Sequence, residues 1–284
     1  MQVLSKNLPD NHNLFHFGDL HDGSVLSSRK GWDRLCNMMS SEYEGCSNNY
    51  GIDGGDMVEA IMVDDIRFSP EKLTEPLPLA QIDQAIALRQ PIKEKLLAIL
   101  MGNHERRLWK FGDITAKVCA TLGVDYGTYT ARLSIKDKDG KLMYKVYETH
   151  GFRNISSTAD DPNRRRSNME LILKRHLKFK AGDCAVMVKH HCHKLLVCKP
   201  ESELYLVDDG KKVKQAYTHW GQEANYIHPD ARWYGSAGSF LRLHGKGISG
   251  YAEIMEYDPV ELGFLITKVR DRKIVGVDSI HLDL

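Results

Sequence analysis

The sequence has no excess of charge of either sign. Its 39 lysine and arginine residues almost balance its 38 aspartate and glutamate residues, and the formal net charge is +1 at pH 7. Binding to nucleic acid without regard to sequence depends on a strong basic field, which this chain lacks. The balance therefore argues against a processive nuclease, and a polyanionic substrate would have to be held by local charges or by metals.

Long apolar runs are also missing. No stretch approaches the roughly 20 apolar residues that span a bilayer. The opening "MQVLSKNLPDNHNLFHFGD" has no basic segment followed by a long apolar stretch, so we expect neither a signal peptide nor a membrane anchor. These absences predict a cytoplasmic protein with no membrane partner.

The six cysteines form no CxxC pair, and we expect them to be reduced core residues rather than disulfides. Internal repeats, low-complexity tracts and obvious linkers are absent as well. We therefore expect one domain over residues 1–284, with loop-rich insertions near residues 153–180 and 210–245.

What the chain does contain is a repeated order of strand, polar turn and helix. Residues 14–17 ("LFHF") predict a strand that stops at "GDLHDGS", and residues 24–39 have apolar residues at helical spacing. The order recurs around "GIDGGDMVE", and again where a helix interrupted by Pro91 leads to the apolar strand "LLAILM" and to "GNHE". This alternation predicts an α/β layered fold with its active site at strand carboxyl ends.

The second half of the chain predicts more strands. β-branched and aromatic residues alternate on both sides of "DKDG", which indicates a hairpin, and a second hairpin is expected around "DDGK". A polar loop and a helix are expected within "DPNRRRSNMELILKRHLKF", and a buried strand before "HHCH". The tail predicts two or three strands.

Five polar turns, each after a predicted strand, contain histidines and acidic or amide residues. They are "GDLH", "GGDMVE", "GNHE", "THGF" and "HHCH". Carboxylate, imidazole and amide ligands suit Mn²⁺, iron or Zn²⁺. There are more candidate ligands than one tetrahedral metal needs, so they favour two metals roughly 3.5 to 4 Å apart and bridged by a carboxylate, a site that hydrolyses phosphate esters.

These blocks, in this order, resemble the calcineurin-like metallophosphoesterases. The family pattern is DxH, GDxx(D/E), GNH(D/E), H and GHxH, and the matching blocks span residues 19–193. The resemblance implies a layered β-sandwich flanked by helices, with a dimetal site at the strand carboxyl ends. Residues 234–253 also resemble stretches of phosphoesterases encoded by bacteriophages, which would place the protein in the host cytoplasm.

The resemblance implies two divalent metals, Mn²⁺ first and Fe, Zn or Ni as alternatives. The first would be held by Asp19, His21, Asp56 and His193. The second would be held by Asp56, Asn103, His150 and His191, with Asp56 bridging and a hydroxide between the metals as nucleophile. His104 would assist the leaving group and Glu105 would orient His104.

Two positions depart from the family pattern. His190 stands where the family has glycine, and we expect it to face away from the metals. Strand alternation would aim His191 and His193 to one face and Cys192 to the other. We interpret Glu59, at the acidic end of "GDMVE", as a supporting residue and not as a ligand. Taken singly, an aspartate or asparagine in such a turn is more often a cap.

The predicted substrate is a phosphodiester or phosphomonoester of nucleotide or nucleic-acid type. Arg106 and Arg107 are candidate substrate contacts, whereas the run Arg164 to Arg166 fits a solvated basic face equally well. Two alternatives stay open. One is a Ser/Thr-type protein phosphatase, although the arginine-glycine extension of those enzymes is missing after "GDMVE". The other is an inactive scaffold of the same fold.

Overall fold

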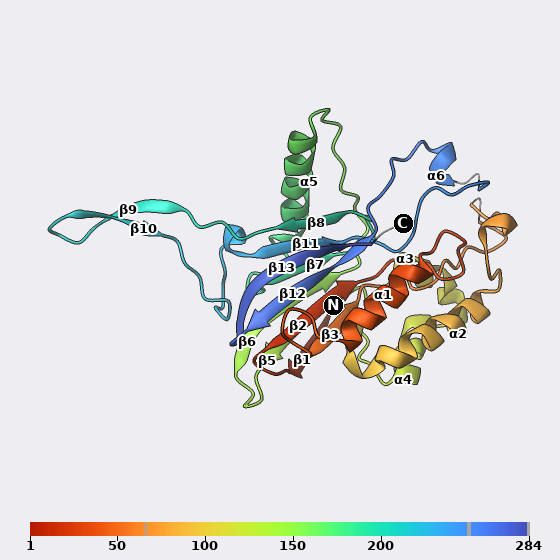
Figure 1. The fold of residues 1–284 in the computed structure, drawn as a ribbon, viewed down its shortest axis with the longest axis horizontal. Coiled ribbons are helices and arrows are strands. Elements are labelled where there is room, and N and C mark those ends of the chain that lie inside the picture. The colour runs from red at the N-terminus through yellow and green to blue at the C-terminus, as the bar shows by residue number, and fades with distance from the viewer. Residues whose placement is uncertain (66, 249–250, 283–284) are drawn as a thin grey trace.

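Two mixed β-sheets form the centre of the molecule, and helices flank them (Figure 1). This is a computed structural model, and it describes residues 1–65, 67–248 and 251–282. The six-stranded sheet has the order β1 (Gln2–Asn7), β5 (Thr130–Lys136), β6 (Leu142–Thr149), β7 (Val186–Lys189), β11 (Trp233–Ala237) and β8 (Leu195–Cys198). The five-stranded sheet has the order β13 (Lys273–His281), β12 (Gly263–Arg270), β2 (His12–Phe17), β3 (Asn49–Asp53) and β4 (Leu96–Ile99). The chain is thus a mixed α/β protein.

Helices cover the outer faces of the two sheets, and one short helix lies in a loop apart from them (Figure 1). The α-helices are α1 (Arg29–Ser40), α2 (Pro78–Arg89), α3 (Asn103–Arg107), α4 (Ile114–Leu122), α5 (Pro162–Leu177) and α6 (Tyr251–Ile254). The 3₁₀ turns are η1 (Pro70–Lys72), η2 (Gln90–Lys95), η3 (Leu108–Phe111) and η4 (Pro229–Ala231). Within the part of the chain that the structure describes, no helix is both long and apolar enough to cross a membrane.

Three apolar clusters hold these layers together. Leu14 and Ile52 of the five-stranded sheet pack with Val146 and Val188 of the six-stranded sheet, so the two sheets share a core. The other face of the five-stranded sheet packs on α1, α2 and α4, and the other face of the six-stranded sheet packs on α5. Every residue of β2 is buried, because Leu14 faces the second sheet while Phe15 and Phe17 face the helices.

Most predicted elements are confirmed. They include the strands around residues 14–17 and 96–101, the helix in residues 24–39, and both hairpins. The helix before Pro91 ends at Arg89 and continues as η2, as a proline in its path requires. Of the two stretches expected to be loop-rich, the first contains α5 and the second contains β11. β1 was not predicted; it is an edge strand that pairs in parallel with β5 and is mostly exposed.

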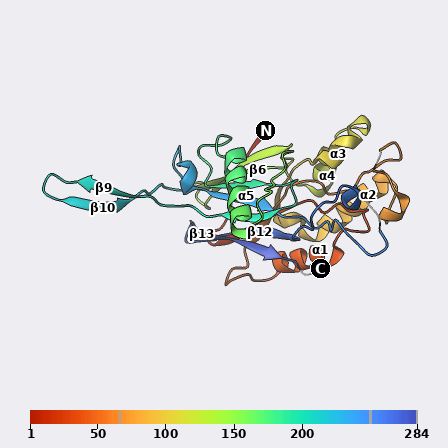
Figure 2. The ribbon, with the colours of Figure 1, turned by 90° about the horizontal axis from the view of Figure 1, so that it is seen from above.

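A hairpin projects from the body of the protein (Figures 1 and 2). It consists of β9 (Leu204–Asp208) and β10 (Val213–Tyr217), which pair with each other and with no other described strand. Nine of its ten strand residues are exposed, and Ala216 is half-buried. At its base the amide of Thr218 donates to the carbonyl of Glu203 at 2.9 Å. We call residues 204–217 the arm.

A buried ion pair lies between α2 and the end of β3. Arg89 Nε donates to Asp53 Oδ2 at 2.7 Å, and both residues are fully buried. The other carboxylate oxygen of Asp53 accepts from the amide of Gly55 at 3.0 Å. The pair therefore fixes the turn that follows β3, which leads to Asp56.

Replacing Arg89 with methionine is expected to lower the free energy of unfolding by about 3 to 5 kcal/mol, because the buried Asp53 carboxylate loses its counter-charge. Chemical denaturation measures the change. Arg166→Met is the matched control, since Arg166 pairs with Glu170 on the exposed surface of α5; its effect should be about 0.5 kcal/mol or less. Equal effects of the two substitutions would contradict the assigned role of Arg89.

Candidate metal centre

The predicted site residues come from turns at the carboxyl ends of five strands. Asp19 and His21 follow β2, Asp56 follows β3, and Asn103 starts the helix after β4. These three strands are parallel neighbours in the five-stranded sheet, so their carboxyl ends share one edge. In the six-stranded sheet, His150 follows β6 and His191 follows β7, which are also parallel neighbours. Because the sheets pack together, the turns meet.

The backbone is left-handed at five of the seven predicted ligands. Non-glycine residues seldom adopt this conformation, and each costs of order 1 to 3 kcal/mol. The values of φ are 54° at Asp19, 52° at His21, 50° at Asp56, 71° at His191 and 49° at His193. Hydrogen bonds between turns hold this geometry: the amide of Asp19 donates to Gly55 and that of His21 donates to Asp56. Such strain is typical of functional sites.

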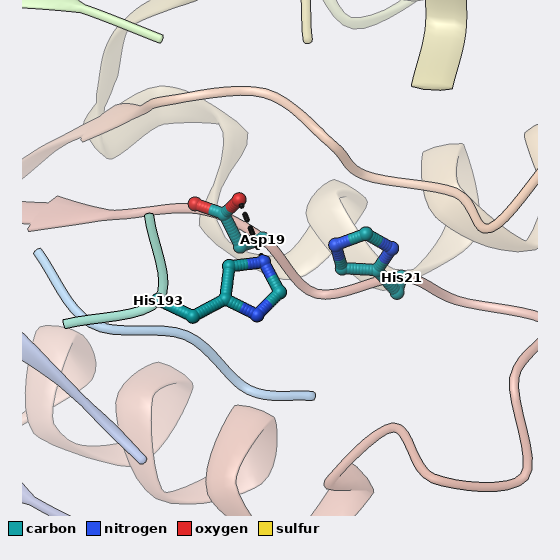
Figure 3. A group of neighbouring side chains, drawn as sticks. All are labelled: Asp19, His21 and His193. Carbon is teal, nitrogen blue, oxygen red and sulfur yellow. Dashed lines mark ion pairs between the residues drawn. The ribbon is translucent and has the colours of Figure 1, made fainter. Parts of the chain in front are cut away.

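Asp19, His21 and His193 form the first group that could hold a metal ion, with ligand atoms all within 4.8 Å of one another (Figure 3). Asp19 Oδ1 lies 3.2 Å from His193 Nε2. Among the described residues, buried His21 Nε2 has no hydrogen-bond partner, and buried Asp19 Oδ1 has only this contact with His193. Unpaired buried polar atoms are costly, and a cation between them would satisfy both.

Asp56, His150 and His191 form the second group, again with ligand atoms within 4.8 Å. His150 Nε2 lies 3.3 Å from Asp56 Oδ2 and 3.0 Å from Asn103 Oδ1. Asp56 Oδ2 is also 3.8 Å from His21 Nε2, so this oxygen lies between the two groups. The structure thus brings together all seven residues that the sequence analysis selected.

The hydrogen bonds behind the histidines select the nitrogen that faces the centre. His150 Nδ1 donates to the carbonyl of Gly54 at 2.8 Å, which leaves Nε2 unprotonated in the neutral ring and available as a ligand. His21 Nδ1 contacts the Glu59 carboxylate at 2.8 Å, so Nε2 again faces inward. Partners of this kind usually stand behind metal-ligating histidines.

Burial and mutual attraction set the charges of the centre. Burial raises the pKa of the Asp56 carboxyl, but the neighbouring His150 and His104 outweigh this and hold it well below its usual range. Burial lowers the pKa of His150, but the charge of Asp56 raises it to about 9. Burial and the charge of His150 lower the pKa of His191 to about 4. Ionised carboxylates thus stand beside histidines, and a divalent cation that binds here would displace the proton that His150 otherwise holds.

His104 lies next to the first group. Its ring centroid is 4.5 Å from that of His21, and its amide donates to Asp56 Oδ1 at 2.8 Å. Its Nδ1 contacts the carbonyl of Glu59, so Nδ1 carries a proton and Nε2 is the nitrogen left for other contacts. Burial lowers the pKa of His104, but the charges of Asp56 and Glu59 outweigh it and raise the pKa above its ordinary value. His104 can therefore donate a proton near neutral pH.

The carboxylate of Glu105 contacts backbone amides and not the His104 ring, which differs from our expectation. Its carboxylate accepts hydrogen bonds from four backbone amides, those of Asp56, Met57, Val58 and Gly102. The contact to the His104 imidazole comes from Glu59 instead, which also supports His21. Burial and the charge of Asp56 raise the pKa of Glu105 to about 7. Glu105 therefore fixes the turn that carries Asp56, and the prediction that it orients the ring of His104 is corrected.

His190 faces away from the two groups, as predicted. Its Nε2 lies 2.8 Å from Glu148 Oε1, and Glu148 Oε2 lies 2.9 Å from His16 Nδ1 of the other sheet. All three residues are buried, and Gly54 has no room for a Cβ because the His190 ring occupies that space. His190 thus packs on the turn after β3 and, through Glu148 of β6, belongs to a polar network that reaches β2 of the other sheet.

Strand alternation was the wrong reason for the orientation of His191 and His193. β7 ends at Lys189, so "HHCH" lies outside the strand, and the left-handed backbone at both histidines sets their directions. Cys192 is buried, as we expected of the cysteines, with Sγ 3.0 Å from Ser236 Oγ.

The side chains of Arg106 and Arg107 contact residues outside the two candidate ligand groups. Arg106 lies over the ring of Trp109 at 4.1 Å, and Arg107 pairs with Asp65 at 2.7 Å. The run Arg164 to Arg166 lies in the exposed first turns of α5 rather than in the polar loop. Within the part of the chain that the structure describes, no hydrogen bond, ion pair or ring contact joins either cluster to the two candidate metal groups.

The sequence matches no family model, and no curated protein matches it either. What is established is an α/β protein with buried histidine and aspartate groups that could hold metal ions.

Proposed function

We propose that the protein is a dimetal phosphoesterase of the calcineurin-like type, which hydrolyses a phosphodiester or phosphomonoester of nucleotide or nucleic-acid type. One observation carries the proposal: two adjoining groups of buried ligands have Asp56 Oδ2 between them. A single structural metal would need only one such group. The five sequence blocks of this family, in the family's order, and a pair of packed mixed sheets support the same assignment.

Each group would hold one divalent metal. The first metal would be held by Asp19, His21 and His193, and the second by Asn103, His150 and His191. Asp56 would contribute to both. The oxygen and imidazole ligands favour Mn²⁺, with Fe, Zn and Ni as alternatives. When bound, the metals would supply a water of lowered pKa and neutralise charge on the phosphate.

The protein's own residues supply the remaining steps. His104 Nε2 donates its proton to the leaving oxygen, while Nδ1 stays on the carbonyl of Glu59, so that the ring keeps one orientation. Glu59 and the Gly54 carbonyl hold His21 and His150 with Nε2 inward. Glu105 and the Arg89–Asp53 pair fix the turn of Asp56. These contacts preorganise the centre before substrate arrives.

Hydrolysis assays with purified protein and added Mn²⁺ test the proposal. We expect turnover of bis(p-nitrophenyl) phosphate or p-nitrophenyl phosphate, loss of turnover after chelation, and about two metal equivalents by elemental analysis. Fe²⁺, Zn²⁺ and Ni²⁺ are tested in parallel. No turnover with any of the four metals would refute the phosphoesterase assignment. Activity confined to phosphoserine peptides would favour a protein phosphatase instead.

A further inference from the structure

Phe152 is an exposed aromatic side chain beside the candidate metal centre. Its ring stacks on that of His191 with centroids 5.4 Å apart and an interplanar angle of 18°, yet 78% of the residue is exposed. One face of the ring therefore covers a predicted ligand while much of the side chain stays open to solvent. A phenylalanine left so exposed forgoes most of the roughly 1.5 to 3 kcal/mol that its burial would contribute, so packing does not account for it.

The turn that carries Phe152 is fixed. Gly151, between His150 and Phe152, has φ of 75°, and the side chain of Lys189 fills the space that a Cβ would need there. On the other side, the amide of His150 donates to the carbonyl of Tyr129 at 3.0 Å, and Tyr129 is 38% exposed. The backbone of this turn is thus held on both sides.

From this arrangement we infer that Phe152 is a stacking surface for a nucleobase of the substrate. The inference rests on the proposed function, because a phosphate held by the second group would lie one side chain away from Phe152. In a nucleotide, a sugar separates the flat base from the phosphate, so the base can reach a ring at the rim while the phosphate occupies the centre. A base on the open face would continue the stack that begins at His191.

Binding of two phosphonates tests the inference. The first is the 5′-methylenephosphonate analogue of thymidine 5′-monophosphate, whose carbon–phosphorus bond is not hydrolysed, and the second is methylphosphonate, which lacks the base and sugar. Calorimetry in the presence of Mn²⁺ is expected to show wild-type protein binding the nucleoside phosphonate more tightly. Phe152→Ala should weaken that binding about ten-fold and leave methylphosphonate binding unchanged, whereas Phe152→Trp should retain it.

Phe179→Ala is the matched control, since Phe179 is 83% exposed and lies beyond the end of α5, outside both ligand groups. It should change neither affinity. If Phe152→Ala weakens both phosphonates equally, Phe152 only supports His191 and the inference is overturned. If it weakens neither, the inference is likewise overturned, while hydrolysis of p-nitrophenyl esters would still support the proposed function. Base-dependent binding through Phe152 without hydrolysis of any ester would refute the proposed function alone.

Discussion

Asp56→Asn is expected to lower kcat by about a thousand-fold, which corresponds to a loss of about 4 kcal/mol of transition-state stabilisation. The substitution keeps the size of the side chain but removes the negative charge of the carboxylate, one oxygen of which lies between the two ligand groups. Neither metal would then be held by its full set of ligands. Elemental analysis should therefore show fewer metal equivalents than the wild type, measured on the same preparations as the kinetics.

Asp209→Asn provides the comparison, since Asp209 lies in the turn of the arm and pairs with Lys214 there. It should leave activity and metal content unchanged. If the Asp56→Asn protein keeps wild-type metal content and wild-type turnover, Asp56 is not part of the centre. The proposal of two adjoining metals would then be refuted.

The second large effect is expected for His104→Ala. Loss of a general acid lowers kcat by about 10² to 10⁴-fold. His104 is outside the proposed ligand sets, so metal content should stay the same, in contrast to Asp56→Asn. The loss should be smaller for an ester with a p-nitrophenolate leaving group than for one with an alkyl leaving group, because p-nitrophenolate needs little protonation.

Loss of metal from the His104→Ala protein would indicate that His104 is a metal ligand. One ring nitrogen of His104 also lies within 4.8 Å of a ring nitrogen of His21 and of a carboxylate oxygen of Glu59. If His104→Ala loses metal as Asp56→Asn does, and slows both leaving groups equally, His104 acts as a ligand rather than as an acid. Wild-type kinetics with both esters would exclude either role.

The candidate ligands could be selected from the sequence because each stands in a turn after an apolar strand. Even His150, a single histidine with a glycine after it, could be selected, since "LMYKVYETH" ends at it. The apolar pattern also located β2, which is buried on both faces. These are local signals, and the rule that parallel strands end at one edge converts them into a shared site.

Sequence patterns did not predict what depends on contacts between distant segments. The roles of Glu59 and Glu105 follow from which turn each carboxylate reaches, and those contacts cross 38 to 49 residues. The left-handed backbone at His191 and His193 goes against local preference, and the amide of His191 donates to the Asp19 carboxylate of a distant turn. The Glu148 network that explains His190 links residues 132 and 42 positions apart. β1 was missed because it is an exposed edge strand with no buried apolar face.

The arm has a consequence for how the protein unfolds. Its chain leaves the body at Glu203 and returns at Thr218, and these two backbones are hydrogen-bonded to each other. The two ends of the loop therefore stay together whether or not β9 and β10 are paired. Pairing of β9 with β10 then costs no further entropy for bringing those ends together. Since the arm contributes no residue to the three buried clusters, it opens as a local unit without cost to the rest of the fold. Opening of the arm is therefore expected to leave the stability of the candidate metal centre unchanged.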